Sequence, residues 1–502
     1  MKLKHLTTAM ILASLPATGA FAAALDRSGQ SMSAFLQPGN YFEAGISFLD
    51  PNVSGQEAGT SETRRNIGDM AEDYYFPNGA IKLQLTDNFS FGLLYDQPFG
   101  AKAEYSGNNV FVSNPATDTI LPAERLNAIR DNTINTTFNA LSSEQRVGLA
   151  LQAQGVDLST QQGQAVYQQT LNAYNNVPAV KTQIDTGVKQ GITDKVNAGI
   201  DAVNNTLGKG NTKVEVDTQN LSMVFGFQPN QNWNIYGGPV YQTVKGNVSL
   251  RGQAYSLYNG YDANIKETSG VGWLAGLAFQ IPEIALKASL TYRSEIDHDV
   301  NINENIPTLP ALALLGASGA AAAQNIAAAS GKTKITTPQS VNLDFQTGIM
   351  ANTVAFANVR WVNWKDFSIQ PYKFGLISEA IGPLVNRPNG FNLVQYSDDQ
   401  WSANVGVGRK LTEKWAGNVS VGWDSGSGNP VTTLGPTEGY WNVGLGVQFS
   451  PAPNYFIAGG VKYFWLGDAK AQTGAQAGGG EYVAEFKDND ALAYGLKIGY
   501  RF

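Results

Sequence analysis

The side chains that carry out most enzyme chemistry are scarce in this chain. It has no cysteine and only two histidines, His5 and His298. His298 stands between Asp297 and Asp299 at the end of an expected strand, where a lone histidine is typical of a solvated rim residue rather than a catalytic base. No cysteine or histidine cluster has the spacing of a transition-metal site, and no glycine loop is placed to hold a phosphate. We therefore expect no enzyme, no cofactor and no metal site.

A different kind of signal lies in a short run that interrupts an alternating segment at residues 88–103. The run consists of Asp96, Gln97, Pro98, Phe99 and Gly100. A proline cannot donate a hydrogen bond to a strand ladder, and a glycine close to it permits a bulge. The run therefore predicts a kink in whatever strand contains it.

The N-terminus predicts export. Lys2 and Lys4 precede an apolar core at residues 9–15 and a small-x-small cleavage site at residues 20–22, so we expect a signal peptide at 1–22. The apolar core is too short to span a bilayer as a helix, and no later segment reaches the roughly 20 apolar residues that a helix needs. The sequence thus indicates an exported protein that is not a helical membrane protein.

The composition favours a particular class of exported protein. Charged residues make up 15% of the chain, aromatic residues make up 11%, and there are 54 glycines. Low charge with many aromatic residues suits a barrel whose outer surface contacts lipid. The net charge of −7 argues against nucleic acid as a partner.

The last stretch of the chain, residues 490–502, has a strict period of two. Tyr500, Ile498 and their alternate neighbours form an apolar, aromatic face, whereas Arg501, Gly499 and theirs are small or charged. Because successive strand side chains point to opposite faces, this pattern predicts a strand. It ends on the aromatic Phe502, as the closing strand of an outer-membrane barrel does.

Similar segments recur along the chain and are joined alternately by short turns and long connections. The expected strands are 42–48, 73–86, 88–103, 221–228, 233–250, 264–281, 284–302, 335–350, 353–370, 395–411, 414–426, 439–450, 454–469 and the closing strand. An even number of about fourteen strands and this asymmetry of connections are features of outer-membrane barrels. We predict an all-β, fourteen-stranded antiparallel transmembrane barrel at residues 40–502, in the outer membrane of a Gram-negative bacterium.

Two long connections depart from the strand pattern. At about 104–213 apolar residues recur at helical spacing, and we expect an inserted helical region outside the cell. Ser142 followed by Gln145 could begin one of its helices. At about 303–334 an alanine-rich run predicts a short apolar helix.

In this frame the chain resembles the long-chain fatty-acid transporters of outer membranes, the FadL family. The resemblance covers essentially the whole mature chain and rests on the order and spacing of four segments. These are AGISFLDPNVSG at 44–55, LTYRSEI at 290–296, VNWKDF at 362–367 and VGWDSGSGNPV at 421–431.

The resemblance implies passive uptake of hydrophobic compounds, with long-chain fatty acids as the first ligand. An N-terminal hatch would plug the barrel, and the ligand would leave sideways where the third strand kinks, at Asp96 to Gly100 with Phe99 lining the opening. The hatch would be residues 23–39, with Leu25 and Phe35 among its apolar residues. Arg251 and Lys373 resemble the basic ligand contacts of the family.

The resemblance also implies an apolar acceptor site for the ligand on the outer side. Its expected residues are Phe111, Leu126, Ile129, Phe138 and the segment 309–315. The expected partners are hydrophobic small molecules, outer-membrane lipid and lipopolysaccharide, and the assembly machinery through the C-terminal strand. The barrel is expected to be a monomer.

This chain departs from the family pattern at its hatch. Only about seventeen residues precede the first strand, and the family's Asn-Pro-Ala motif is absent from them; the Asn-Pro-Ala at 114–116 follows the third strand and is interpreted as coincidental. The chain is therefore interpreted as a divergent, short-hatch member. Three alternatives stay open: uptake of aromatic hydrocarbons or other apolar ligands, an open porin, and a surface-binding protein that uses the barrel as an anchor.

Overall fold

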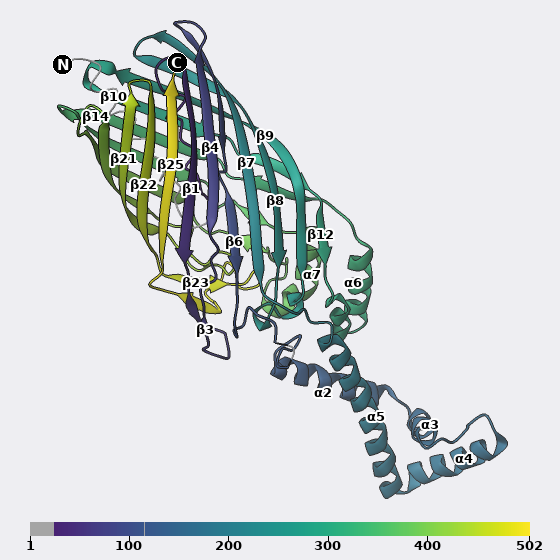
Figure 1. The fold of residues 1–502 in the computed structure, drawn as a ribbon. Helices are drawn as coiled ribbons and strands as arrows, with labels where there is room; N and C mark the ends of the chain where they lie inside the picture. The colour runs from purple at the N-terminus through teal and green to yellow at the C-terminus, as the bar shows by residue number, and fades with distance from the viewer. Residues whose placement is uncertain (1–24, 115) are drawn as a thin grey trace.

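A closed antiparallel barrel forms the body of the protein (Figure 1). The computed structural model describes residues 25–114 and 116–502, so the predicted signal peptide at 1–22 lies outside the described residues. Sixteen strand segments form one sheet, which closes where β10 pairs with β9. In chain order these segments are β1 (Tyr41–Asn52), β4 (Tyr74–Gln84), β5 (Phe89–Asp96), β6 (Gly100–Glu104), β7 (Lys213–Asn230), β8 (Trp233–Ser249), β9 (Asp262–Ile281), β10 (Leu286–Arg293), β12 (Ile302–Asn305), β14 (Ser340–Met350), β15 (Thr353–Val362), β18 (Gln400–Lys410), β19 (Trp415–Asp424), β21 (Tyr440–Ala452), β22 (Tyr455–Leu466) and β25 (Asp490–Arg501).

The sixteen segments make fourteen staves, where a stave is one crossing of the barrel wall. β6 continues β5 along β7, and β12 continues β10 along β9, so two of the sixteen segments extend a neighbour. The predicted fourteen-stranded barrel is confirmed. Short turns join the staves at the end that holds the C-terminus, and the long connections lie at the opposite end (Figure 1). Outer-membrane barrels place their long connections outside the cell.

The first and last strands close the barrel in continuous register. β1 pairs with β25 from Tyr41 opposite Arg501 to Asn52 opposite Asp490. Along β25, Tyr494, Leu496 and Ile498 are exposed while the residues between them are buried. The period of two read from the last residues therefore separates the outer wall from the lumen.

The end of the first strand is one of several strand boundaries that differ from the sequence prediction. We expected the first strand to stop before Asp50 because of Pro51, but β1 continues to Asn52. Pro51 lies opposite Ala491 of β25, whereas the ladder between β1 and β4 has already ended at Leu49. The missing proline N–H therefore costs no ladder bond on the β4 side.

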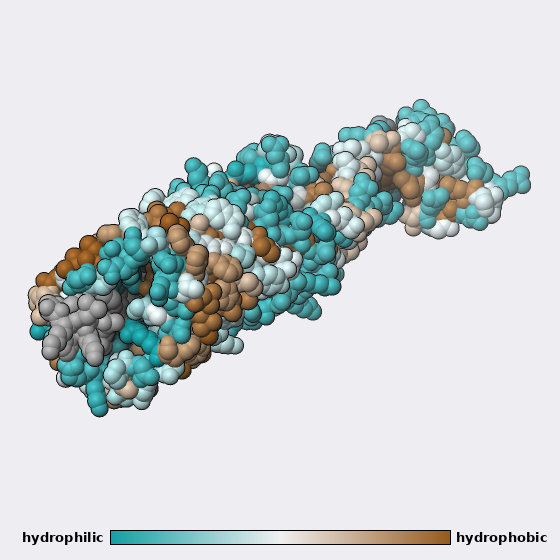
Figure 2. All heavy atoms as spheres, turned by 90° about the horizontal axis from the view of Figure 1, so that it is seen from above, coloured by the Kyte–Doolittle hydropathy of each residue, from teal (hydrophilic) through white to brown (hydrophobic). Residues whose placement is uncertain are grey.

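Aromatic residues mark both edges of an apolar outer wall. Toward the long connections a row of tryptophans crosses five consecutive staves, with Trp361 opposite Trp401, and Trp423 and Trp465 both opposite Trp441. Toward the short turns, Trp415 packs against Phe449 and Trp233 against Phe279. Between the two edges the exposed side chains are mainly Val, Leu, Ile and Phe, and Figure 2 shows brown patches on the wall. These are the aromatic girdles and lipid-facing band of a transmembrane barrel.

On β7 the outer face changes character along the strand. Lys213, Glu215 and Asp217 point outward at the far end, and Leu221 and Phe225 point outward closer to the short turns. Since charged side chains are costly in hydrocarbon, the edge of the apolar band crosses β7 between residues 217 and 221.

Helices and small sheets cover the far end of the barrel. The insertion between β6 and β7 forms α2 (Ala123–Ala140), α3 (Ser143–Ala153), α4 (Gln161–Asn176) and α5 (Pro178–Asn204), which project away from the barrel (Figure 1). The Ser142 side chain caps α3, and a separate core formed by Phe138, Val147, Tyr174 and Ile184 holds the helices together. No helix among the described residues has the length and apolar character that crossing a bilayer requires.

The remaining elements close the barrel beneath this projecting arm. They are β2 (Gly55–Glu57), β3 (Asn66–Ile67), η1 (Gln253–Tyr258), β11 (Ile296–Val300), η3 (Leu309–Leu315), α6 (Ala317–Ala328), β13 (Thr333–Thr337), β16 (Ser368–Ile369), α7 (Tyr372–Ile381), η4 (Gly382–Val385), β17 (Val394–Gln395), β20 (Val431–Thr432), β23 (Ala469–Gln472) and β24 (Ala484–Phe486). The short helix η2 (Pro282–Ile284) lies in the turn between β9 and β10, at the other end of the barrel. Tyr258, Phe374 and Phe391 pack ring against ring at the centre of this cover, with 4.2 Å between the rings of Tyr258 and Phe374. The cover is therefore an apolar core that closes the outer end of the lumen.

A carboxyl group in the loop between β19 and β21 makes the stability of that loop depend on pH. Glu438 accepts hydrogen bonds from the backbone N–H groups of Ser427 and Gly428 at 3.3 and 3.1 Å. Burial, with a smaller contribution from Asp398, raises the pKa of Glu438 to about 7 from its ordinary value of 4.5. The folded loop thus binds the proton more tightly than the unfolded chain does, so stability should fall as pH rises from about 4.5 through about 7.

This dependence can be measured on the apparent unfolding temperature between pH 5 and 8. We expect the wild type to lose up to about 3 kcal/mol across this range and Glu438→Gln to lose much less. Asp398→Asn serves as the control, because it removes only the smaller contribution. Equal pH profiles for wild type and Glu438→Gln would contradict the prediction.

Candidate functional site

The third stave is broken where the sequence predicts a kink. β5 ends at Asp96 and β6 begins at Gly100. Asp96 pairs with Asn220 of β7 and Gly100 with Asp217, so four steps on the third stave match three steps on β7. The extra residue makes a bulge, and the Phe99 N–H donates to the Thr218 hydroxyl at 2.9 Å.

On its other side the third stave separates from β4. The last pair of the ladder is Gly79 with Tyr95, and the described residues 74–78 of β4 make no further pair with the third stave. Contact resumes beyond the break, where the Tyr74 hydroxyl donates to the Lys102 carbonyl at 2.7 Å. We call the space between residues 74–78 and 97–101 the wall gap.

The first residues of the hatch lie in this gap and pair with the kink. The Arg27 N–H donates to the Pro98 carbonyl at 2.6 Å, and the Gly100 N–H donates to the Leu25 carbonyl at 2.8 Å. Asp26 stands opposite Phe99 in an antiparallel bridge. Because Phe99 itself bonds to β7, these bonds use the edge of the third stave that faces β4. Residues 25–27 therefore occupy the edge that β4 leaves unpaired.

The rest of the hatch fills part of the lumen, as the predicted short plug requires. Met32, Phe35 and Leu36 are buried against inward-facing side chains of the wall, and the Phe35 ring lies 5.7 Å from that of Tyr236. The Lys287 ammonium donates to the Leu36 carbonyl at 2.8 Å. Residues 32–36 thus lie inside the lumen.

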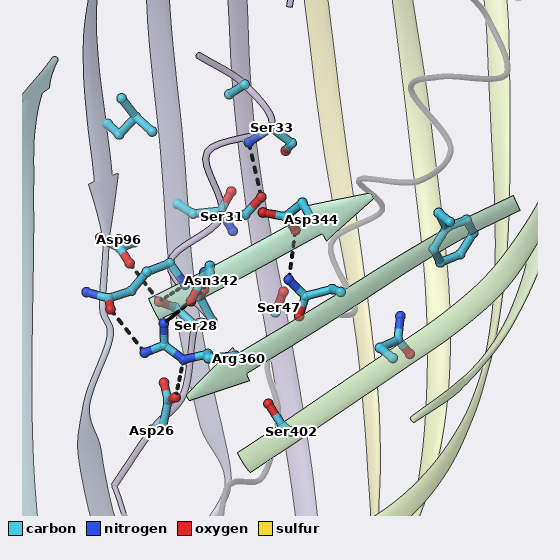
Figure 3. A pocket seen from close by; sticks show the side chains of 18 of the residues that line it. Asp26, Ser28, Ser31, Ser33, Ser47, Asp96, Asn342, Asp344, Arg360 and Ser402 are labelled. Carbon is cyan, nitrogen blue, oxygen red and sulfur yellow. Dashed lines mark hydrogen bonds and ion pairs between the residues drawn. The ribbon is translucent and has the colours of Figure 1, made fainter. Parts of the chain in front are cut away.

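A buried ion pair holds the start of the hatch to the opposite wall (Figure 3). The Arg360 Nε lies 2.7 Å from Asp26 Oδ2, and the two side chains are 4% and 5% exposed. Arg360 also donates to Asn342 Oδ1 at 2.7 Å and to Gln30 Oε1 at 3.0 Å. Ser28, the next residue but one after Asp26, donates to Asp96 at 2.6 Å. The hatch is thus joined both to the kinked stave and across the lumen.

Residues 25–27 separate two cavities of different polarity. Toward the cover, a mainly apolar cavity is lined by Leu49, Val53, Met70, Val214, Val216, Val248, Ile265, Leu393 and Leu434, together with Tyr74 and Gly100 at the wall gap. Toward the short turns, a polar cavity is lined by Ser28, Gln30, Asp96, Lys287, Asn342, Asp344, Arg360, Asn404, Lys462 and others. Among the residues that the structure describes, Asp26 alone lines both cavities.

The structure brings most of the sequence-predicted residues together. Leu25 and Gly100 line the apolar cavity, and Asp96 and Gln97 line the polar one. Pro98 accepts the hatch hydrogen bond, the Phe99 ring packs edge-on against Trp364 at 5.5 Å, and Phe35 lies in the hatch core. A contiguous hatch-and-kink site results.

The two basic candidates lie elsewhere. Arg251 is paired with Asp262 at 2.6 Å and donates to the Tyr261 carbonyl, and neither cavity includes it. The Lys373 ammonium donates to the Ala327 carbonyl at 3.1 Å in the cover. Both side chains are held by protein groups at the outer end of the barrel.

His298 differs from the expectation of a solvated rim residue, because it is fully buried. β11, which carries it, follows the end of the ladder between β10 and β9 at Arg293 and pairs with β13 instead. The ring then faces inward and its Nε2 lies 2.8 Å from Gln242 Oε1, which also accepts from Thr337. His298 therefore belongs to a polar network within the lumen.

Sequence reasoning did not single out three residues of the wall gap: Arg27, Tyr74 and Asp217. The sequence offers one sign of them: Arg27 is the only basic residue between positions 25 and 40. Its partners lie 47 and 190 positions further along the chain, and no local pattern connects them.

Comparison with known proteins places this geometry in a family. No curated protein matches the sequence. A Pseudomonas aeruginosa FadL homologue has a similar structure, with a TM-score of 0.58 at 12% identity over 98% of each chain. The Pseudomonas putida toluene transporter TodX aligns over 97% of each chain with a TM-score of 0.50 at 8% identity. Identities this low show a shared fold alone.

The sequence match is more specific. The family described as outer membrane protein transport protein (OMPP1/FadL/TodX) matches residues 107–502, which include all the staves from β7 to β25. The chain therefore belongs to this family, and it is an outer-membrane barrel that transports hydrophobic compounds.

Proposed function

We propose that this protein takes up hydrophobic compounds passively, through the apolar cavity and out sideways through the wall gap. The observation that carries the proposal is the position of the gap. The gap borders both cavities at the hatch: Tyr74 and Gly100 line the apolar cavity, whereas Phe76, Asn78 and Gln97 line the polar one. A ligand in the apolar cavity thus has an apolar space behind it, a polar space ahead and lipid beside it.

The energetics favour the sideways route. Each methylene that moves from an apolar site into water loses about 0.8 kcal/mol, so a long acyl chain is less stable beside the charged and amide side chains of the polar cavity than in the apolar cavity. Passage through the wall keeps the chain in apolar surroundings. The resemblance read from the sequence makes long-chain fatty acids the first ligand that we propose.

A second ligand class, uncharged hydrocarbons, is favoured by the charges around the apolar cavity. Each charged side chain that lines it has an opposite charge nearby: Asp26 has Arg360, Lys102 has Glu72 at 2.7 Å, and Arg27 has Asp217. A neutral ligand leaves these pairs intact. A solved structure of similar fold is that of a toluene transporter.

Uptake of radiolabelled oleate and of labelled toluene by cells with and without the protein tests the transport. The variant Pro98→Val with Gly100→Val tests the route. Gly79 pairs with Tyr95 on one side of the gap, and Ala71 pairs with Ala103 on the other. Both strands advance by eight residues between these two pairs, so β4 and the third stave remain in register across the gap. Valine at position 98 restores a backbone N–H donor, and a side chain at position 100 would overlap the Arg27 guanidinium and displace the hatch. We therefore expect β4 to pair directly with the third stave and uptake to be lost.

Gly417→Val is the matched control, because a side chain at this wall position has room and no gap lies nearby. If the double variant transports as the wild type does, the lateral route is wrong. If neither compound depends on the wild-type protein, transport of these ligands is wrong, and the open-porin and surface-anchor alternatives gain.

A further inference from the structure

The guanidinium of Arg27 lies within the wall gap rather than in the lumen. It stacks over the ring of Tyr74 at 4.1 Å and packs against the backbone of Gly100, where a side chain would overlap it. Its Nη1 lies 3.5 Å from Asp217 Oδ1. Asp217 points outward from β7 and is 37% exposed, whereas Arg27 is 9% exposed. The arginine therefore reaches from the hatch through the wall to an outer-face carboxylate.

The hydrogen-bonding capacity of this guanidinium is incompletely used. Among the described atoms its Nη2 is buried and has no hydrogen-bond partner. Its ion pair at 3.5 Å is also longer than the 2.7 Å pair between Arg360 and Asp26. A buried donor without a partner is costly, and a charged one more so. The site would gain from a second acceptor.

The surrounding charges leave Arg27 as the cation available to a ligand in the apolar cavity. Lys102, the other cation that lines it, is paired with Glu72 at 2.7 Å. Asp26, the neighbouring carboxylate, is directed toward Arg360 on the polar side (Figure 3). Lys213 on the outer face is paired with Glu104 at 3.1 Å. Among the described residues that line this cavity Asp26 is the only carboxylate, and its charge is paired with that of Arg360.

We propose that Arg27 binds the carboxylate of an amphipathic ligand at the wall gap, while the apolar tail of that ligand lies in the apolar cavity. The ligand carboxylate takes the place of Asp217, because the two parallel N–H groups of a guanidinium match a carboxylate and Asp217 uses them poorly. Since the hatch holds Arg27 there, this residue distinguishes carboxylates from uncharged hydrocarbons. The inference rests on the proposed function.

Oleate and methyl oleate test this role, because they share one tail and differ in the charge. Equilibrium binding of both labelled compounds to the purified full-length protein should show that Arg27→Met weakens oleate binding at least about tenfold, the loss expected for one charged hydrogen bond. Methyl oleate binding should stay within about twofold. Arg27→Lys should recover part of the oleate affinity, and Asp217→Asn should strengthen oleate binding several-fold by removing the competitor.

The heat-dependent gel mobility of each folded barrel shows whether a variant has folded. If Arg27→Met folds and binds oleate and methyl oleate in the wild-type ratio, Arg27 does not recognise the carboxylate. If Asp217→Asn leaves the affinity for oleate unchanged, the exchange with Asp217 is wrong. If the wild type binds neither compound, the proposed function fails for this ligand pair. That result differs from the failure of the Arg27 proposal alone, in which the wild type binds both compounds and Arg27→Met keeps the wild-type ratio.

Discussion

A disulfide between positions 26 and 99 should reduce uptake to the level of cells without the protein, and a reductant should restore it. Asp26 and Phe99 form a pair whose flanking residues make the hydrogen bonds. In such a pair the Cα atoms lie about 4.5 Å apart, which is within the range that a disulfide spans. The chain has no cysteine, so Asp26→Cys with Phe99→Cys can form only this intramolecular bond. It would fix the hatch to the kinked stave and keep the gap closed.

The two single-cysteine variants are the matched controls, because each carries one of the changes without the crosslink. Asp26→Cys also removes the partner of Arg360, so its uptake measures that effect separately. If the oxidised and the reduced double variant show the same uptake, the hatch need not leave the kink during transport.

Asp26→Asn should release the start of the hatch from the lumen. The substitution leaves Arg360 buried with no opposite charge, and breaking one partner of a buried pair typically costs about 3–5 kcal/mol. At the lower value, amide hydrogen exchange of residues 25–30 should become more than about 100-fold faster. The staves should keep their wild-type exchange rates, because their ladders do not involve Asp26.

The double variant Asp26→Asn with Arg360→Gln separates charge from geometry. Removing both charges leaves no unpaired buried ion, so amide hydrogen exchange of residues 25–30 should be slower in the double variant than in Asp26→Asn alone. Exchange of residues 25–30 that stays at the wild-type rate in Asp26→Asn would show that Asn342, Gln30 and the backbone bonds hold the hatch by themselves.

The barrel could be predicted because its determinants are local. Each stave alternates between lipid and lumen, so a period of two such as that of residues 490–502 is visible within a dozen residues. The predicted end of the first strand before Pro51 was wrong because its determinant is not local. Whether a missing N–H matters depends on where the neighbouring β4 ladder ends, and the sequence of β1 does not contain that information.

The candidate site likewise has one feature with local determinants and several that depend on distant segments. Pro98 and Gly100 mark the kink by their own backbone properties, and the structure has β5 and β6 meet there. The wall gap depends on β4, the ion pair of Asp26 joins residues 334 positions apart, and the path of Arg27 depends on three separate segments. Such contacts follow from the register of a closed barrel and become visible only with the fold.

The change of character along the outer face of β7 sets the depth of the wall gap in the membrane. Asp217 and Asn220 pair with the two ends of the kink, and the outer face turns from charged to apolar between residues 217 and 221. The gap therefore opens at the level of the lipid headgroups, not at the middle of the hydrocarbon. A molecule that emerges there can lay its tail among the acyl chains while its polar end stays at the interface. The charged end is thereby spared the cost of entering hydrocarbon, and the orientation of the released molecule in the leaflet is fixed as it leaves.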